Sequence, residues 1–154
     1  MEKIKLSSNN NNKNQPSNLE AEQALLGSIL VNNDIIDEVS TIINPNSFYD
    51  PAHTKIYEVI ETLNNKGMIA NPITLKNYFE KDNMLDDVGG TEYLVKLTRF
   101  SSSTKQAIDY SKVIHEMYLR RELILISDQL SSETLNTKEQ SAENIIESTE
   151  KSLF

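Results

Sequence analysis

The chain has 154 residues, of which 38 % are hydrophobic and 25 % are charged, so it has room for one domain or for one domain with an appendage. Its formal net charge of −8 disfavours wrapping a nucleic-acid backbone, which proteins bind mainly through lysine and arginine. It has no cysteine for disulfides or cysteine-based zinc sites and no apolar run long enough for a membrane span or a signal peptide, so we expect a cytoplasmic protein.

The N-terminal residues 1–17 are expected to form a disordered tail. They are rich in Asn, Lys and Ser and lack periodic apolar positions. A first helix follows at about residues 18–31. Ser17 is its candidate N-cap, and Glu20, three residues later, is the candidate capping-box partner.

Two further helices are predicted before residue 67. Asp34 is expected to cap a second helix, whose apolar face extends to Ile43 and which Pro45 ends. Asp50 followed by Pro51 combines a cap with a first-turn proline and predicts a third helix, which Gly67 ends.

The pair Asn71 and Pro72 repeats that signal and predicts a fourth helix. Residues 82–90 are polar and end in two glycines, which indicates a loop, and Thr91 is expected to cap a short fifth helix. No strand pair of the hairpin type occurs. The sequence therefore predicts an all-α fold with a compact globular helical subdomain over residues 18–103.

Residues 104–154 are predicted to form a long helix and a helical hairpin. Neither Pro nor Gly occurs from residue 104 to about residue 135, and a helix of ~30 residues would be ~45 Å long, so its later half should protrude from the subdomain. A last helix begins near Ser141 and makes the hairpin antiparallel. Its outer apolar residues, with Leu125, Ile126 and Leu130 as candidates, need a second surface, which a second copy would supply in a C2 four-helix bundle.

We find no pattern that indicates a catalytic, cofactor or metal site. The four glycines form no phosphate loop, and the two histidines, His53 and His115, lack further ligands at metal-site spacing. His53 is expected to make a local hydrogen bond in its first turn. First-turn acids such as Glu20 and Glu22 are explained by the helix dipole. A small α-helical enzyme with an acid pair is a remote alternative.

A helix-turn-helix DNA-binding regulator is the main alternative function. It would place Arg120 and Arg121 on DNA, whereas ion pairing with Glu116, Glu122 or a partner subunit is favoured. The six tyrosines are spaced as core residues rather than as base-stacking platforms.

Three blocks occur in order: Leu-Glu-Ala-Glu-Gln-x-Leu-Leu-Gly-Ser at residues 19–28, Asn-Ser-Phe-Tyr-Asp-Pro-Ala-His at 46–53 and Asp-Val-Gly-Gly-Thr-Glu-Tyr-Leu at 87–94. Shorter matches are Pro-Ile-Thr-Leu at 72–75 and Arg-Arg-x-Leu-Ile at 120–124. From about residue 18 to the last residue, the sequence resembles the N-terminal domain of DnaB-type replicative DNA helicases.

The resemblance implies a scaffold rather than an enzyme. Such a domain forms a collar on a hexameric ring, built as a trimer of hairpin-mediated dimers, and receives the C-terminal helicase-binding domain of primase. ATP and Mg²⁺ would be bound by a motor domain that this chain lacks, and the collar itself would bind little or no DNA and no membrane.

The resemblance also implies which residues contact partners. The expected contacts with primase are Ile124, Leu130 and Ile145, each of which could instead lie in the dimer core, whereas Ile126 is expected at the dimer seam. Asn71 and Thr91 stand where the family often has Asp and an aromatic or apolar residue, near subunit contacts.

Overall fold

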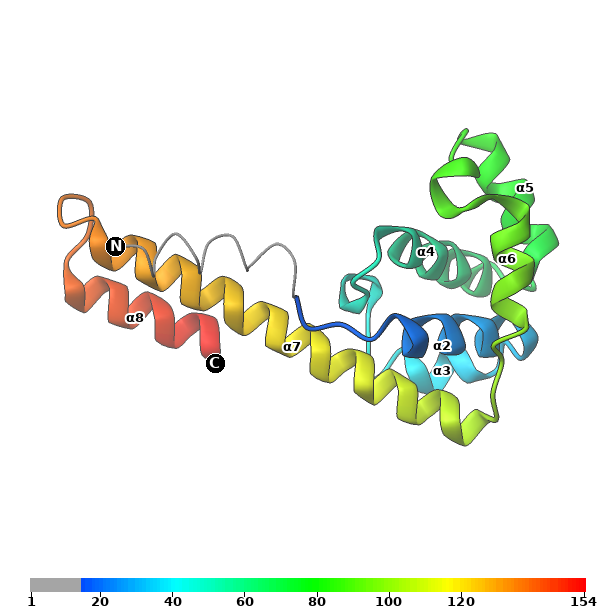
Figure 1. Ribbon diagram of the computed structural model, residues 1–154, viewed down its shortest axis with the longest axis horizontal. Helices are drawn as coiled ribbons and strands as arrows, with labels where there is room; N and C mark the ends of the chain where they lie inside the picture. The colour runs from blue at the N-terminus through cyan, green and yellow to red at the C-terminus, as the bar shows by residue number, and fades with distance from the viewer. Residues whose placement is uncertain (1–14) are drawn as a thin grey trace. The chain divides into compact units, whose positions relative to one another are not determined.

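All regular elements in residues 15–154, which the computed structural model describes, are helical, as the sequence predicts (Figure 1). The expected disordered tail at residues 1–17 falls outside the described residues as far as position 14. In chain order the elements are α2 (Leu19–Val31), α3 (Ile35–Val39), the 3-10 helix η1 (Pro45–Ser47), α4 (Pro51–Asn65), α5 (Pro72–Lys81), the 3-10 helix η2 (Asp86–Val88), α6 (Gly90–Thr98), α7 (Thr104–Leu135) and α8 (Ala142–Leu153).

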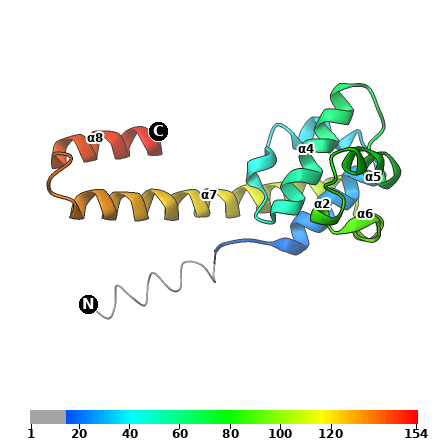
Figure 2. The same cartoon turned by 90° about the horizontal axis from the view of Figure 1, so that it is seen from above.

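The chain divides into two compact units, and the division falls inside α7. The globular unit is Ser17–Tyr118, which takes in the beginning of α7. The hairpin unit contains Leu119–Phe154 together with the residues just before Ser17. Within it, α8 runs antiparallel to the C-terminal half of α7 (Figures 1 and 2).

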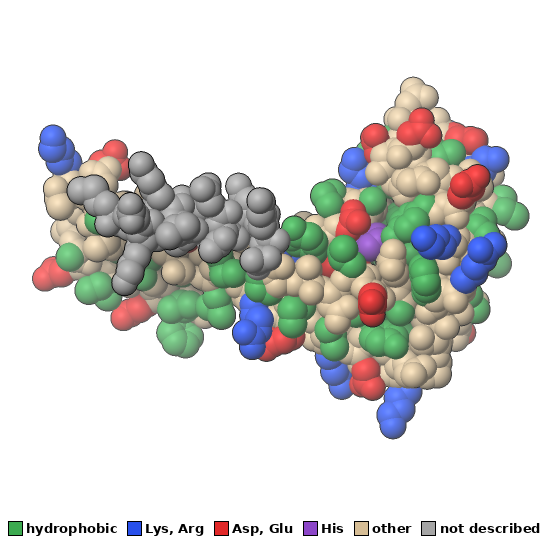
Figure 3. Space-filling view, in the orientation of Figure 1, with side chains coloured by type: hydrophobic (Ala, Val, Ile, Leu, Met, Phe, Trp, Pro, Cys, Tyr) green, Lys and Arg blue, Asp and Glu red, His purple; other side chains and the backbone are tan. Residues whose placement is uncertain are grey.

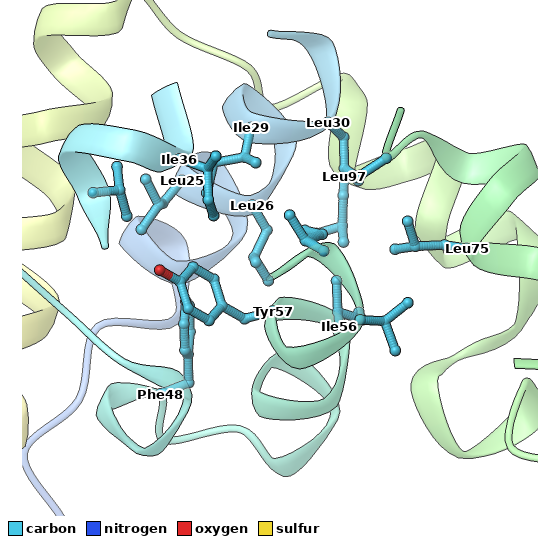
Figure 4. Close-up of a cluster of buried hydrophobic side chains, with 14 of the residues drawn as sticks. Leu25, Leu26, Ile29, Leu30, Ile36, Phe48, Ile56, Tyr57, Leu75 and Leu97 are labelled. Carbon is cyan, nitrogen blue, oxygen red and sulfur yellow. The ribbon is translucent and has the colours of Figure 1, made fainter. Parts of the chain in front are cut away.

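The core of the globular unit is built around α2. Nine of its 13 residues are buried, because α3, α4 and α6 pack around this helix. Figure 4 shows side chains from α2 to α6 meeting in this core, with Leu26 of α2 near Ile56 and Tyr57 of α4. The beginning of α7 closes the core with Ala107 and Ile114.

Gly27 lets α2 and α6 approach each other closely. A Cβ atom at this position would overlap the Leu97 carbonyl and lie 3.3 Å from the backbone nitrogen of Ser101. Next to Gly27, the Ser28 hydroxyl donates to Ala24 O over 2.7 Å and accepts from Ser102 N over 2.9 Å. This stretch of α2 therefore touches the backbone that leads into α7.

The predicted helix starts are confirmed where the cap is an Asx or Ser residue in extended conformation. The Asp50 side chain accepts from Ala52 N over 2.9 Å, and the Asn71 side chain accepts from the first turn of α5, in a capping box with Thr74. Ser141 caps α8 by accepting from Asn144 N over 3.2 Å.

Three predicted caps are wrong. Asn18, rather than Ser17, caps α2 by accepting from Ala21 N over 2.9 Å. Asp34 makes no side-chain cap hydrogen bond. Thr91 lies inside α6, which Gly89 precedes as N-cap with a φ of 97°.

The reason for the last error lies in the two glycines of residues 82–90. Gly89 and Gly90 both have positive φ, a conformation that glycine adopts without steric cost, so the chain turns directly from η2 into α6. The predicted loop therefore contains a 3-10 turn and ends before Thr91.

The second helix is also shorter than predicted. α3 ends at Val39, although Ile42 and Ile43 still pack against the core. The hydroxyls of Ser40 and Thr41 donate to the carbonyls of Asp37 and Glu38 over 3.1 and 2.7 Å, and such bonds compete with continuation of the helix. Pro45 begins η1 rather than ending α3.

Candidate functional site

The residues predicted to contact partners differ in exposure within the hairpin unit. Ile145 of α8 is 4 % exposed, whereas Leu130 of α7 is 36 % exposed. Ile124 and Ile126 are half-buried. Ile145 therefore belongs to the interior of the hairpin, and the other three side chains present apolar surface along α7.

An open groove of about 430 Å³ lies at the closed end of the hairpin. Leu130 and Ile145 both line it, together with Ile146, so the structure brings two of the four predicted hairpin residues into one site. Ile124 and Ile126 are not among its lining residues.

The hairpin unit exposes further large apolar side chains (Figure 3). These are Leu119, Leu123, Leu125, Leu135, Ile146, Leu153 and Phe154. Residues 119–154 carry seven acidic and four basic side chains, a net charge of −3. The hairpin surface is thus both apolar and acidic, although none of the buried core residues of α7 lies beyond Ile114.

Asn71 and Thr91, the predicted subunit contacts, lie in the globular unit. Asn71 is engaged at the start of α5, where its Oδ1 accepts from Ile73 N and Thr74 N over 3.0 Å each. Thr91 lines an open groove of about 610 Å³ on α6 together with Val95 and Phe100, which are 41 % and 38 % exposed.

A buried carboxylate holds the globular unit together at the start of α4. Glu22 is 1 % exposed, and its Oε2 accepts from Tyr49 N over 2.8 Å while Oε1 accepts from Asp50 N over 3.3 Å. His53 Nδ1 lies 2.8 Å from the same Oε1. The carboxylate of α2 therefore fixes the backbone that leads into α4.

The hydrogen bonds continue from His53 to α6. His53 Nε2 lies 2.6 Å from the Tyr93 hydroxyl, which accepts from Gln23 Nε2 over 3.1 Å. One assignment satisfies every partner: Gln23 donates to Tyr93, Tyr93 donates to Nε2, and Nδ1–H donates to Glu22. Burial raises the pKa of the Tyr93 phenol above its ordinary value, the carboxylates of Asp50 and Glu22 add to this, and the Gln23 bond opposes it.

This polar cluster corrects two sequence interpretations. Glu22 is more than a helix-dipole acid, and His53 makes its hydrogen bonds with α2 and α6 rather than in its own first turn, where Asp50 Oδ2 lies 4.0 Å from Nε2. The available signal was the position of Glu22, three and four residues before Leu25 and Leu26 and therefore on the apolar side of the predicted helix. Glu22, His53 and Tyr93 come from the three sequence blocks that carry the family resemblance, one from each. With every polar atom in it paired, the cluster serves as a structural clamp.

Arg121, one member of the basic pair of α7, also has a backbone partner that the sequence did not predict. The Arg121 guanidinium Nη1 donates to Pro16 O over 2.7 Å. This bond ties the segment before α2 to the hairpin helix. In the described part of the chain, no group of His, Asp and Glu side chains could hold a metal ion, and no helix is long and apolar enough to cross a membrane.

The family model of the DnaB-like helicase N-terminal domain matches residues 14–116. The chain belongs to this family. The replicative DNA helicase DnaB of Rickettsia felis is 39 % identical over 140 residues, which are 90 % of this chain and 28 % of that protein. The DnaB of Pasteurella multocida is 30 % identical over 139 residues, 90 % of this chain and 30 % of that protein. The chain thus spans less than a third of the length of these relatives.

Two solved structures of DnaB-type proteins share the fold. The N-terminal domain of DnaB helicase from Mycobacterium tuberculosis is 25 % identical, with a TM-score of 0.81 over 91 % of this chain and 98 % of that one. A DnaB-like replicative helicase, described with its interactions with primase, is 28 % identical, with a TM-score of 0.71 over 88 % of this chain and 31 % of that one. The all-α DnaB N-terminal fold is therefore confirmed.

Proposed function

We propose that this chain is the N-terminal collar of a replicative DNA helicase, a scaffold that self-associates and docks primase. Membership of the DnaB-like family supports the assignment, and a relative of the same fold is described with its interactions with primase. ATP, Mg²⁺ and DNA translocation belong to a motor in the parent helicase, outside these 154 residues, and the collar acts in the cytoplasm without a bound cofactor.

The exposed apolar face of the hairpin carries this proposal. A two-helix hairpin buries one seam, and within the described residues 119–154 only Ile145 is fully buried. Leu119 and Leu123 share one face of α7 and remain 45 % and 53 % exposed, which is unfavourable in water and favours pairing with the same face of a second copy. A C2 dimer places Ile126 and its neighbours at a four-helix seam.

Primase would dock on the groove at the closed end of the hairpin. Leu130 is the exposed apolar anchor of this groove, and the buried Ile145 side chain forms part of its lining. Ile124 extends the apolar surface along α7. Interface affinity comes from a few buried apolar anchors, so these side chains account for most of it. Bound primase then favours one arrangement of the collar over another, and the motor responds to that bias.

Three hairpin dimers need a second contact to close a ring, because one isologous interface ends in a dimer. The groove on α6 that includes Thr91, Val95 and Phe100 supplies apolar surface for that contact. Asn71 orders the start of α5 in the same unit and fixes the shape of the neighbouring surface.

Light scattering of the purified chain, with and without the C-terminal domain of primase, tests this function. We expect a dimer or a larger assembly that gains mass with primase. Leu130→Asp should weaken binding because it places a charge on an apolar anchor, whereas Ser131→Asp is a control with the same added charge on the adjacent exposed position. A chain that stays monomeric and ignores primase would refute the proposal, and tight, salt-sensitive DNA binding would favour the helix-turn-helix alternative.

A further inference from the structure

We propose that residues 1–14, the N-terminal arm, bind in cis to the exposed apolar face of the hairpin and compete there with a second copy of the chain. The competition rests on the proposed self-association, whereas the docking of the arm stands independently of it. The occupant is a named segment of this chain, and the described residues that follow it show where it starts.

The arm is tethered at the hairpin itself. The bond from Arg121 Nη1 to Pro16 O, 2.7 Å long, ties the backbone two residues beyond the arm to α7. Pro16 and Arg121 are 105 residues apart in sequence, yet both belong to the hairpin unit. Pro16 is therefore held on the side of α7 that carries Arg121 and, one helical turn later, the exposed Leu125, and the arm has to pass around the helix to reach Leu119 and Leu123.

The arm is long enough to cover this face. Fourteen residues reach at most about 46 Å when extended, whereas α7 continues for only about 21 Å beyond Arg121. Even a partly compact arm can therefore reach Leu125 and the groove at Leu130. The extended arm is therefore longer than the part of α7 that follows Arg121.

The composition of the arm complements that of the hairpin. The arm carries Lys3, Lys5 and Lys13 against one acid, a net charge of +2, whereas residues 119–154 have a net charge of −3. Ile4 and Leu6 alternate with two of these lysines. A segment that combines apolar and basic side chains suits a surface that is apolar and acidic.

A tethered arm is present at a higher effective concentration near the hairpin than a free partner. Short flexible tethers give effective concentrations in the millimolar range, far above the concentration of a second copy in dilute solution. If the docked arm leaves about a tenth of the hairpins open, it weakens apparent self-association by about a hundredfold, because both copies must be open to pair. The arm thus delays assembly until the local concentration of chains is high.

A spin label tests the docking directly. The chain has no cysteine, so Ser8→Cys provides a single labelling position in the full chain. At a concentration at which light scattering gives the monomer mass, we expect the label to broaden the backbone amide signals of Leu123, Leu125 and Leu130 and to spare those of α4. Lys3→Gln with Lys5→Gln should reduce the broadening, whereas Asn9→Glu with Asn11→Glu, which changes the net charge equally, should retain more of it.

Two results would overturn the proposal. One is the absence of broadening on α7. The other is broadening that appears only when labelled chain is mixed with isotope-labelled, spin-free chain, because the occupant would then be the arm of a second copy. In light scattering, Ile4→Asp with Leu6→Asp should lower the apparent dissociation constant of the dimer by about a hundredfold. A chain that never dimerises would refute the proposed function, while the spin-label result would still decide whether the arm docks.

Discussion

His53 Nδ1 lies 2.8 Å from Glu22 Oε1 in a part of the globular unit where both residues are 1 % exposed. The pair joins α4 to α2, and the Tyr93 hydroxyl at 2.6 Å from His53 Nε2 extends the connection to α6. A hydrogen bond to a buried charged group contributes more to stability than a surface ion pair, because neither partner can turn to water.

His53→Ala should lower the free energy of unfolding by roughly 3 kcal/mol, because it removes a donor from the buried Glu22 carboxylate and leaves a cavity. Urea unfolding followed by circular dichroism measures the loss. His115→Ala is the matched control on the half-buried surface of α7 and should change stability by about 0.5 kcal/mol or less. Equal losses for the two variants would contradict the role of the cluster.

Tyr57→Phe should leave the free energy of unfolding unchanged or raise it by up to about 1 kcal/mol. The Tyr57 hydroxyl is buried and has no hydrogen-bond partner in the described part of the chain, so the native state gains nothing from it. Thermal unfolding of Tyr57→Phe and Tyr93→Phe side by side checks this. Tyr93→Phe removes two hydrogen bonds and should be the less stable variant; the opposite order would refute the assignment.

Stability should fall above about pH 10, and Tyr57 should contribute to the fall. Burial, with the Glu61 carboxylate adding to it, raises the pKa of the Tyr57 phenol far above its ordinary value. The unfolded chain therefore loses this proton first, so the stabilisation is complete below the unfolded pKa and declines as the pH rises past it. Urea unfolding between about pH 9 and 11 should show a shallower decline for Tyr57→Phe than for the unchanged chain. Parallel declines would exclude this contribution.

Gly27→Ala should destabilise the globular unit by at least about 1–3 kcal/mol, although alanine is the better helix former. The added methyl group meets the backbone carbonyl of Leu97, which no change of side-chain rotamer can move away. Val31→Ala, at a position on the same helix that is 62 % exposed, should be nearly neutral. Denaturant midpoints of the two variants measure the difference, and a stable Gly27→Ala chain would show that α6 can shift.

Local signals predicted most of the helix positions. Asp50 with Pro51, Asn71 with Pro72, and Ser141 each act on a backbone two or three residues away, so the sequence pattern alone locates them. The long helix was predictable for the same reason, since nothing in residues 104–135 interrupts it. The choice between neighbouring caps, as at Asn18, depends on the chain's entry angle, which the local sequence does not contain.

The polar cluster could not be predicted because its partners are distant in sequence. Glu22 and His53 are 31 residues apart, and His53 and Tyr93 are 40 apart. Each residue taken alone has an ordinary local explanation. The hairpin groove was partly predictable, since helical spacing places Leu130 on the apolar face of the long helix. Only the packing of α8 shows that the Ile145 side chain is buried inside the hairpin.

The clamp formed by Glu22, His53 and Tyr93 also limits how the globular unit can misfold. If α4 or α6 slid by one turn along α2, the carboxylate would be sealed in the interior without its donors, at a cost of several kcal/mol. Apolar side chains alone would tolerate such a slip far better, because apolar contacts are not directional and one apolar neighbour can replace another. The buried Glu22 thus makes packings with a shifted helix unstable and keeps α2, α4 and α6 in one alignment.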